Sequence, residues 1–427
     1  MLIKGNANKL IGEIMVPGDK SISHRSIMIG SLANGNTVVR NILKSEDVSM
    51  TIDAFRRMGV DIEYDRNDVY IKGKGINGLK QPEGILDCGN SGTTMRIISG
   101  ILVGQKFSTT LTGDKSLSKR PMDRIIIPLR KMNANISGRE DKYSPINIKP
   151  VRTNLKTIKY KLPVASAQVK SSILLATLYA RGTTTIIENK ITRDHTERML
   201  NYFGCPVINE NGIIYMGSNC NLEGRNVYVP GDISSAAYFI VAASLIKDSN
   251  LIIRNVSINP TRIGIIHVLK KMKADIKILN KRILNNEPIG DIQVKYSPLV
   301  GANIEGEIIG TLIDEIPIIA VAASLAEGTT VIKNAEELKY KESNRISSIS
   351  KELNKMGANI VELHDGMIIE GKRNLVAATL NSYNDHRIAM ALSIAALRAE
   401  GQTRIRDFEC IDVSYPNFYN TLYKLYL

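Results

Sequence analysis

The sequence predicts an α/β fold (α+β) of two domains, each built from three repeats of a strand-helix-strand-helix-strand-strand unit. The stretch "VPGDKS" at Val16 returns as "VPGDIS" at Val229, 213 residues later and half of the 427-residue chain. A pattern of helix, turn and strand also occurs six times at regular spacing. Because such internal similarity is typical of repeated supersecondary units, we expect six pseudo-repeats arranged as two inside-out α/β barrels.

Each repeat opens with small and apolar residues at helical spacing, followed by a turn and a β-branched strand. The first copy is "DKSISHRSIMIGSLANGNTVVRNI" from Asp19, and the last is "NDHRIAMALSIAALRAEGQTRIRD" from Asn384. The turns between helix and strand are expected at Gly35, Gly104, Gly182, Asp248, Gly328 and Gly401. Successive turns are 69, 78, 66, 80 and 73 residues apart, so the repeats divide the chain almost evenly.

A second helix follows the strand in most repeats and often ends in a Met-Gly-like step, as in "DAFRRMGVDIEY" and "KELNKMGANIVEL". The sixth repeat lacks its final strands, whereas residues 1–18 carry extended segments without a helix. We therefore expect one domain at 19–228 and a second at 229–427 plus 1–18. Pro and Gly at both VPGD steps suit the two crossing points, which would form a hinge.

Composition and targeting signals favour a cytoplasmic protein. No apolar run approaches the roughly 18–20 residues of a membrane span, and the start "MLIKGNANK" is too polar for a signal peptide. None of the cysteines, Cys88, Cys205, Cys220 and Cys410, forms a C-x-x-C pair. We expect no metal and no cofactor, and free, mostly buried thiols.

The net charge of +14 implies acidic partners. Lys and Arg are spread along the chain, and no basic-aromatic recognition motif occurs, which favours small anions over nucleic acid or membrane. A basic six-repeat nucleic-acid-binding protein is the alternative from another class. It is disfavoured because the repeats place Asp314, Glu342 and Asp385 beside the cations, where a phosphate clamp needs no carboxylates.

Helix starts are the expected sites of anion binding, because a helix N-terminus offers free N–H groups and partial positive charge. "GDKSISHRS" and "YKESNR" gather cations at a helix start, where the dipole disfavours them unless an anion is bound. Asp232 and Ser234 have no cation beside them in the sequence, so the second VPGD copy is interpreted as an ordinary helix cap. Lys20 is the functional difference, and a lysine at Ile233 should do little harm.

Seven ordered motifs then identify a resemblance that covers essentially the whole chain. They are "VPGDKSISHRS", "GNSGTTMR", "LSKRPM", "SAQVKS", "DEIP", "KESNR" and "YNDHRIAM". The chain closely resembles the 3-phosphoshikimate 1-carboxyvinyltransferase (EPSP synthase) family of enolpyruvyl transferases. The resemblance implies transfer of the enolpyruvyl group of phosphoenolpyruvate to the 5-hydroxyl of shikimate 3-phosphate, with release of phosphate and no metal. It also implies that the active site lies in the cleft between the two domains. It places the protein in the shikimate pathway to chorismate and aromatic amino acids, and we expect a monomer.

The same resemblance assigns site residues motif by motif. Shikimate 3-phosphate is expected at Lys20, Ser21, Arg25, Ser166, Gln168, Arg193, Asp314 and Lys341. Phosphoenolpyruvate is expected at Lys20, Gly92, Arg120, Gln168, Arg345 and Arg387. Proton transfer needs a base for the hydroxyl and an acid for the methylene carbon, for which Asp314 and Glu342 are the candidates, with Lys20 as a third catalytic residue. Whether His386 or Lys20 shares the proton transfer stays open.

Two positions set the chain apart within this resemblance. Val413 falls about where many members carry a Lys that touches phosphoenolpyruvate, and Ala167 replaces a serine that some members use. Gly92 is retained, so sensitivity to the herbicide glyphosate stays open. The nearest rival, UDP-N-acetylglucosamine enolpyruvyl transferase, uses a cysteine in the loop at 112–123, and that loop has none here.

Overall fold

The computed structural model describes residues 1–5, 7–65, 68–218 and 220–426. They form a mixed α/β fold that divides into two compact units. The first-half unit comprises Gly18–Val229 with Ile283–Glu287. The second-half unit comprises Met1–Pro17, Pro230–Arg282 and Pro288–Leu427. The chain thus passes between units within both VPGD steps, and the segment Ile283–Glu287 adds a passage that the sequence did not suggest.

The first-half unit contains six helices and fourteen strands among its described residues. Its helices are α1 (Lys20–Leu32), α2 (Glu46–Arg57), α3 (Gly92–Leu102), α4 (Asp123–Lys131), α5 (Ala167–Thr177) and α6 (His195–Tyr202). Its strands are β3 (Asn34–Arg40), β4 (Asp61–Asp65), β5 (Asp68–Lys74), β6 (Leu86–Asp87), β7 (Thr109–Thr112), β8 (Asn135–Arg139), β9 (Tyr143–Lys149), β10 (Leu155–Lys156), β11 (Lys159–Lys161), β12 (Ala180–Arg181), β13 (Thr183–Ile187), β14 (Val207–Glu210), β15 (Ile213–Gly217) and β16 (Asn226–Tyr228).

The second-half unit holds the other six described helices. They are α7 (Ile233–Leu245), α8 (Gly264–Lys271), α9 (Ile316–Ser324), α10 (Arg345–Lys355), α11 (His386–Leu397) and α12 (Phe418–Tyr426). The strands are β1 (Leu2–Lys4), β2 (Ile11–Met15), β17 (Asn250–Ser257), β18 (Asp275–Leu284), β19 (Glu287–Lys295), β20 (Asn303–Ile304), β21 (Thr329–Ile332), β22 (Asn359–Leu363), β23 (Gly366–Glu370), β24 (Leu375–Val376), β25 (Thr379–Asn381), β26 (Ala399–Glu400) and β27 (Gln402–Arg406).

One strand order recurs in the sheets. It joins a parallel pair to an antiparallel hairpin, as in β16-β3-β5-β4, β6-β7-β9-β8, β11-β13-β15-β14 and β20-β21-β23-β22. The N-terminal strands enter two sheets made mostly of distant residues: β1 pairs with β27, and β2 pairs in parallel with β17. Backbone hydrogen bonds thereby bind β1 and β2 to the second-half unit.

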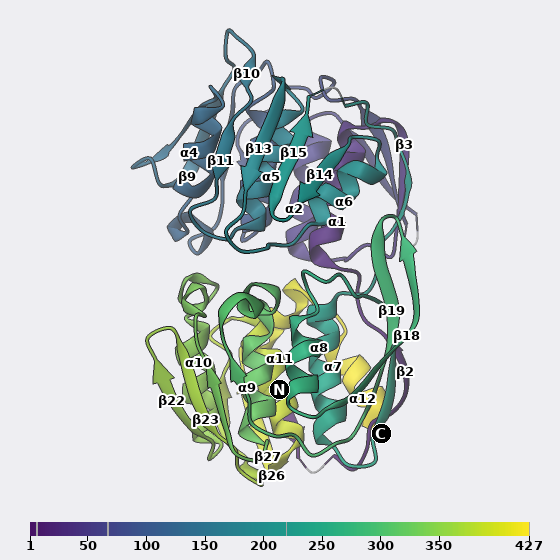
Figure 1. Ribbon diagram of the computed structural model, residues 1–427, viewed down its shortest axis with the longest axis vertical. Helices are drawn as coiled ribbons and strands as arrows, with labels where there is room; N and C mark the ends of the chain where they lie inside the picture. Colours follow the sequence, from purple (N-terminus) through teal and green to yellow (C-terminus); the bar gives the residue numbers. More distant parts are fainter. Residues whose placement is uncertain (6, 66–67, 219, 427) are drawn as a thin grey trace. The chain divides into compact units, whose positions relative to one another are not determined.

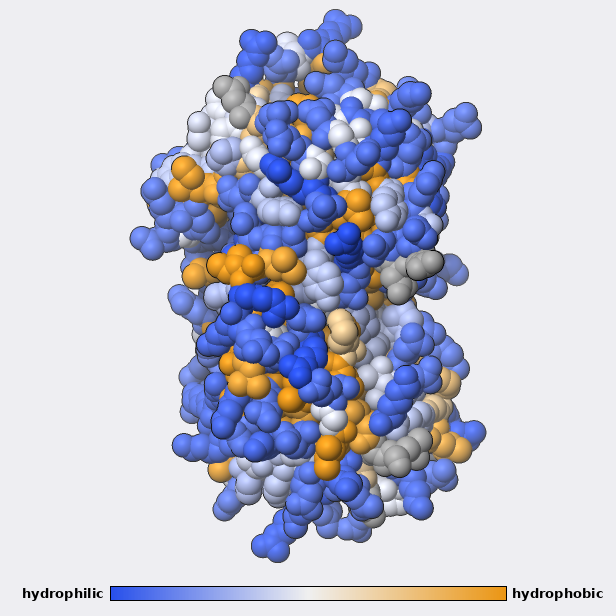
Figure 2. Space-filling model, turned by 90° about the vertical axis from the view of Figure 1, so that its right-hand side faces the viewer, coloured by the Kyte–Doolittle hydropathy of each residue, from blue (hydrophilic) through white to orange (hydrophobic). Residues whose placement is uncertain are grey.

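Helices lie inside each unit and strands cover its outside, as the ribbons show (Figure 1). In the second-half unit α7, α9 and α11 pack against one another, and their buried faces are almost entirely aliphatic. Each of these helices is apolar nearly all round, which is typical of a helix surrounded by other elements. Hydrophilic side chains cover most of the face shown in Figure 2, with apolar patches between them. No helix in the described part of the chain has both the length and the apolarity to cross a bilayer.

The predicted Met-Gly-like ends of the second helices are confirmed. Met58, Met132, Met272 and Met356 are the C-caps of α2, α4, α8 and α10, and all four side chains are fully buried. The residue after each cap takes a left-handed backbone, for example φ 84° at Gly59 and φ 73° at Lys273. A left-handed residue lets the chain leave the helix and satisfy the last carbonyl groups, so this step ends the helix by local geometry.

The expectation of four free thiols is wrong for one pair. Cys205 and Cys220 form a disulfide, with their Cα atoms 4.7 Å apart, whereas Cys88 and Cys410 are free. The antiparallel register of β14 and β15 places Val207 opposite Met216 and brings the segments outside the hairpin together. Sequence spacing did not show this proximity, because it depends on the register of the hairpin.

Candidate active site

The start of α1 presents the residues expected to meet both substrates. Asp19 caps the helix by accepting a hydrogen bond from the Ile22 N–H, and Lys20 is its first residue. Lys20 Nζ lies 3.0 Å from Asp47 Oδ2, and its side chain is 21% exposed. Asp47 relieves part of the unfavourable interaction between a cation and a helix N-terminus. The ammonium therefore stays partly accessible to an incoming anion.

Arg25 is held more rigidly than Lys20. Its Nε donates to Thr196 Oγ1 (2.6 Å), Nη2 to Ser171 Oγ (2.8 Å) and Nη1 to the Ser21 carbonyl (2.9 Å). Burial lowers the pKa of Arg25 to about 10, so the guanidinium stays charged at neutral pH. The contacts join α1 to α5 and α6 and bring Arg25 together with Ser21, as the motif assignment expects.

Gln168 and Ser166 lie at the start of α5. Ser166 is the N-cap residue and accepts a hydrogen bond from the Val169 N–H. Gln168 Oε1 accepts from Arg96 Nη1 (2.7 Å), and its Nε2 donates to Thr93 Oγ1 (3.1 Å). The hydrogen bond from Arg96 and the one to Thr93 together fix the orientation of the Gln168 amide. Arg96 was not assigned a role from the sequence, although it ends the quoted motif "GNSGTTMR".

Arg120 lies beside the start of α3. Its Nη2 donates to Asn90 Oδ1 (2.7 Å) and to Ser116 Oγ (3.2 Å). A Cβ atom on Gly92 would stand 3.5 Å from Arg120 Nη1, so the glycine leaves room around the guanidinium. Gly92 and Arg120 are thus neighbours, as expected for two residues assigned to one ligand.

Arg193 lies in the segment between β13 and α6, and a buried ion cluster holds that segment. Lys170 Nζ lies 3.1 Å from Glu188 Oε2 and 2.6 Å from Glu197 Oε1, and the Lys170 side chain is fully buried. Burial opposes the charge on Lys170, but the two carboxylates outweigh it and raise its pKa. Glu188 precedes Arg193 and Glu197 follows it, so the cluster fixes both ends of this segment.

Asp314 is the centre of the charged group in the second-half unit. It lies in a 3₁₀ turn (Ile313–Glu315) directly before α9. Asp314 Oδ1 is 3.3 Å from Lys341 Nζ and 3.2 Å from Arg345 Nη1, and Oδ2 is 3.8 Å from Arg387 Nη2. Three cations around one buried carboxylate favour its ionised form, which is the form a general base needs.

Arg345 joins Asp314, the candidate base, to Glu342, the candidate acid. Its Nη2 lies 2.5 Å from Glu342 Oε2, and its Nε donates to Asp385 Oδ2 (2.8 Å). Burial opposes the charge on Arg345, but the carboxylates of Asp385 and Glu342 outweigh it and raise its pKa. Glu342 is 26% exposed, so both proton-transfer candidates touch one guanidinium while only Glu342 is open to solvent.

His386 and Arg387 begin α11, and Asp385 caps that helix by accepting from the Arg387 N–H. Arg387 Nη1 donates to the Asp314 carbonyl oxygen at 3.3 Å. The carboxylates of Asp314 and Glu315 help raise the pKa of Arg387, against the effect of burial. Both residues at the helix start are buried, and Arg387 lies against Asp314.

The assigned residues are divided between the two units. The first-half group contains Lys20, Ser21, Arg25, Gly92, Arg120, Ser166, Gln168 and Arg193. The second-half group contains Asp314, Lys341, Glu342, Arg345 and Arg387. Neither unit alone holds every residue of the assigned set. Among described residues no cluster of three or more metal-ligating side chains occurs.

The second VPGD copy caps α7 as predicted, because Asp232 accepts a hydrogen bond from the Ser234 N–H. Two statements about its surroundings are wrong. Asp232 and Ser234 do have a cation beside them, because Arg262 Nη2 lies 3.2 Å from Asp232 Oδ1 and 2.8 Å from Ser234 Oγ. Ile233 is fully buried in the core of the second-half unit, so a lysine there would place an amine among aliphatic side chains. Arg262 comes from a loop after β17, and nothing in the motif itself indicated that contact.

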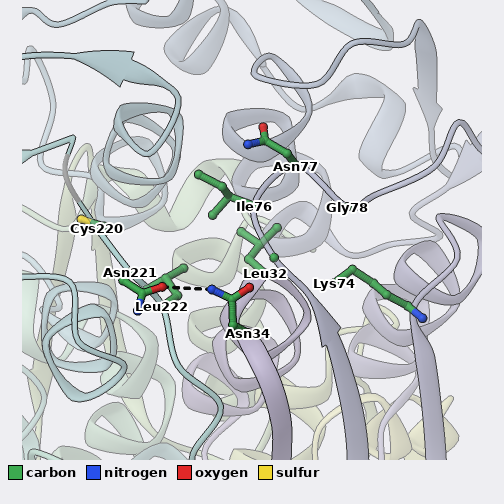
Figure 3. A pocket seen from close by; sticks show the side chains of 10 residues that line it. Leu32, Asn34, Lys74, Ile76, Asn77, Gly78, Cys220, Asn221 and Leu222 are labelled. Atoms are coloured by element: carbon green, nitrogen blue, oxygen red, sulfur yellow. Dashed lines mark hydrogen bonds between the residues drawn. The ribbon is translucent and has the colours of Figure 1, made fainter.

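A cavity of about 490 Å³ lies elsewhere in the first-half unit, between Leu32, Ile76 and Leu222, with the Asn34 and Asn221 amides bonded across one side (Figure 3). Leu32 ends α1 and Lys20 begins it, so the cavity is about 18 Å along the helix from Lys20. None of the assigned site residues lines it. This cavity is separate from the candidate active site.

Fold and charge together define the class: a two-unit α/β protein with cations and carboxylates gathered at helix starts. Comparison with known proteins identifies the family within this class. The family model described as EPSP synthase (3-phosphoshikimate 1-carboxyvinyltransferase) matches residues 5–422. The chain belongs to the EPSP synthase family.

Individual relatives agree with the family match. The 3-phosphoshikimate 1-carboxyvinyltransferase of Thermoanaerobacter sp. (strain X514) is 56% identical over 412 residues, covering 96% of this chain and 97% of the relative. The protein of the same name from Bacillus licheniformis is 50% identical over 424 residues, covering 99% of both chains. A solved EPSP synthase from Acinetobacter baumannii superposes with a TM-score of 0.91 at 45% identity, covering 100% of this chain and 98% of that one.

Proposed function

We propose that the protein transfers the enolpyruvyl group of phosphoenolpyruvate to the 5-hydroxyl of shikimate 3-phosphate, giving 5-enolpyruvylshikimate 3-phosphate and phosphate. The observation that carries this proposal is the family match over residues 5–422, with relatives of that name at 50–56% identity. The charged groups are compatible with it, because two polyanions need several cations and Arg binds carboxylate or phosphate through a bidentate fork.

Shikimate 3-phosphate is bound by Lys20, Ser21, Arg25, Ser166, Gln168, Arg193, Asp314 and Lys341. Arg25 supports this assignment most directly, because three hydrogen bonds hold its guanidinium in one position before any ligand arrives. A fixed donor loses less conformational entropy when it binds a ligand. Lys341 and Asp314 form an ion pair, so the carboxylate assigned as the base is held beside a cation assigned to the same ligand.

Phosphoenolpyruvate is bound by Lys20, Gly92, Arg120, Gln168, Arg345 and Arg387. A side chain at Gly92 would contact Arg120 Nη1, at 3.5 Å from its Cβ, so the glycine leaves that side of the guanidinium uncovered for an anion. Arg345 and Arg387 both contact Asp314, so the assigned base and the cations for phosphoenolpyruvate are adjacent. Such adjacency holds the hydroxyl close to the enol carbon that it attacks.

Asp314 accepts the proton of the 5-hydroxyl, and Glu342 donates a proton to the methylene carbon as the new C–O bond forms. Glu342 then recovers a proton from that carbon while the C–O bond to phosphate breaks, which restores the enolpyruvyl double bond. Glu342 must therefore be protonated before addition. An incoming anion disfavours a neighbouring carboxylate, so phosphoenolpyruvate itself promotes the acid form of Glu342.

The finer architecture is part of the proposal. We infer domains at 19–228 and at 229–427 plus 1–18, each made of three repeats in an inside-out α/β barrel. The shared strand order of the sheets and the central position of the first helices support it. The substrate-binding set draws on both units, so both are needed for activity. We further propose a monomer that works in the cytoplasm on small anions.

The test is phosphate release by the purified protein with shikimate 3-phosphate and phosphoenolpyruvate. We expect release that needs both substrates, and none when UDP-N-acetylglucosamine replaces shikimate 3-phosphate. Mass spectrometry of the organic product should show the enolpyruvyl ether. Release with the UDP-sugar, or no release with shikimate 3-phosphate, would overturn the proposal.

A further inference from the structure

No residue of the second VPGD copy is assigned to the proposed function. Its side chains cap α7, and they also make further buried contacts. Asp232 caps α7 by accepting from the Ser234 N–H. Ser234 occupies the position that Ser21 holds in the first copy. Both side chains are buried and both bind Arg262, whose side chain is only 3% exposed. Burying a guanidinium costs free energy unless a carboxylate or another acceptor pairs with it. The contacts of Arg262 with Asp232 and Ser234 supply that pairing.

The same serine carries the contact onward to a buried carboxyl group. Ser234 Oγ donates to Glu315 Oε1, and Glu315 Oε1 also lies 3.7 Å from Arg387 Nη1. Glu315 is 1% exposed and directly follows Asp314. A chain of buried polar contacts therefore runs from Asp232 and Arg262 through Ser234 and Glu315 to Arg387.

Charge explains why this chain is tolerated. Arg262 compensates Asp232, and Arg387 is shared between Glu315 and Asp314. Burial raises the pKa of Glu315, while the guanidinium groups of Arg387 and Arg262 oppose that rise. Ser234 has one hydroxyl proton and gives it to Glu315, so its oxygen is free to accept from Arg262. Each member thus fixes the geometry of the next.

We propose that Glu315, held by Ser234 and Arg262, is a positioning residue that orients Arg387 toward phosphoenolpyruvate. The inference rests on the proposed function, in which Arg387 binds that substrate. The second VPGD copy then acts on the substrate indirectly, through a buried network, whereas the first copy acts directly through Lys20. A network that only stabilises the fold would instead affect both substrates alike.

The test measures KM for each substrate in Glu315→Gln. The amide keeps the shape of the side chain but loses the charge facing Arg387. We expect KM for phosphoenolpyruvate to rise about 10-fold, as for loss of one charge-assisted contact. KM for shikimate 3-phosphate should stay within about 2-fold, because Arg387 is not assigned to that ligand.

Glu352→Gln is the matched control. Glu352 is equally buried in the second-half unit, but it pairs with Lys355 and Tyr383 rather than with Arg387. It should leave the ratio of the two KM values unchanged even if it lowers stability. An equal rise in both KM values for Glu315→Gln, or the same ratio as in Glu352→Gln, would overturn the proposal.

Ser234→Ala provides a second, milder variant in case Glu315→Gln does not fold. It removes the hydroxyl between Arg262 and Glu315 and leaves every charge in place. KM for phosphoenolpyruvate should rise about 3-fold, and an unchanged value in this folded variant would contradict the inference. Wild-type protein that releases no phosphate would refute the proposed function. Active wild-type protein with unaltered KM ratios in the variants would refute only the positioning role.

Discussion

Helices α1 and α7 start from the same motif 213 residues apart, yet they do different things. Both begin after an aspartate whose side chain caps the helix: Asp19 accepts from the Ile22 N–H, and Asp232 from the Ser234 N–H. The next residue is Lys20 in α1, partly exposed beside Asp47, and Ile233 in α7, fully buried. The caps are alike because capping depends on local backbone geometry. The first side chain differs because it depends on what the fold packs against it.

The difference extends to the units that these helices belong to. The unit of α1 supplies Lys20, Arg25 and Arg120, which suit the binding of anions. The unit of α7 supplies Asp314 and Glu342, the only carboxylates assigned to proton transfer. A repeated backbone therefore does not imply a repeated function, because chemistry resides in side chains that vary between repeats.

The largest expected effects distinguish the two helix starts: one substitution should lower stability, and the other should lower turnover. Ile233→Lys should destabilise the fold by about 4 kcal/mol or more, because it buries an amine without a partner. Lys20→Met should leave the fold intact and lower turnover about 1,000-fold, since two anions lose charge-assisted contacts of about 1.5–3 kcal/mol each. Urea unfolding and phosphate release measure the two effects.

Lys74→Met is the control for Lys20→Met. Lys74 also forms an ion pair, with the exposed Asp61, but it lines the cavity beside Leu32, at the opposite end of α1 from Lys20. Exposed pairs contribute little, so turnover should stay within about 2-fold of wild type. A folded, fully active Ile233→Lys protein would show that the two positions are equivalent after all.

The next effect tests the carboxylates of the α7 unit. Asp314→Asn and Glu342→Gln should preserve the fold and lower turnover at least about 100-fold, the lower scale of general acid-base catalysis. The amides keep size and hydrogen bonding but cannot exchange the required proton. Steady-state phosphate release, with circular dichroism to check folding, measures this loss.

Isotope exchange distinguishes the two carboxylates. Glu342→Gln should slow the exchange of solvent deuterium into the methylene group of phosphoenolpyruvate, whereas Asp314→Asn should hinder loss of the hydroxyl proton. Mass spectrometry of phosphoenolpyruvate recovered from heavy water reports the exchange. Exchange at the wild-type rate in Glu342→Gln would show that another residue, with Lys20 the first to test, is the proton donor.

The sequence could predict contacts between residues close together in the chain, but not contacts between distant segments. Caps such as Asp19, Ser166 and Asp385 and helix ends such as Met58 could be predicted, because their hydrogen bonds join residues a few positions apart. The motifs that carry the family resemblance also contain every assigned site residue except Arg193, which was placed from "TRDHTE".

Contacts between distant segments could not be predicted in this way. Arg262 lies 30 residues beyond Asp232, and no pattern in its loop marks it as a partner. Glu315 was adjacent to the assigned Asp314, but its burial and its contact with Ser234, 81 residues earlier, come only from packing. The disulfide likewise depended on hairpin register. The expectation about Ile233 failed for the same reason, because burial is a property of the whole core.

A smaller effect should distinguish the stability of the two units. The Cys205–Cys220 disulfide closes a short loop in the α1 unit, across a sequence separation of 15 residues, and the cysteine of the α7 unit, Cys410, is free. Replacing both linked cysteines by serine should destabilise the α1 unit by about 2–3 kcal/mol, since the unfolded chain gains freedom. Urea unfolding followed by hydrogen exchange would locate the loss, and an equal loss of protection in both units would contradict it.

The smallest expected effect is a pH dependence that belongs to α1 and has no counterpart in α7. His24 in α1 is fully buried, whereas the matching position in α7 is Ala237. Burial lowers the pKa of His24 from 6.5 to about 3, and its Nδ1 is bonded to Thr51 Oγ1. Below pH 6.5 the unfolded chain therefore binds a proton that the folded protein does not, so stability falls as the pH decreases toward about 3. Between pH 7 and pH 5 this one group should remove about 2 kcal/mol of stability.

His24→Gln should lose that share of the pH dependence, although the variant is less stable at pH 7. His364→Gln is the control, because His364 is 79% exposed and its replacement should leave the slope unchanged. Urea unfolding at several pH values measures the slope for all three proteins. An identical slope for wild type and His24→Gln would show that His24 becomes protonated in the folded protein, and that α1 carries no pH-sensitive group that α7 lacks.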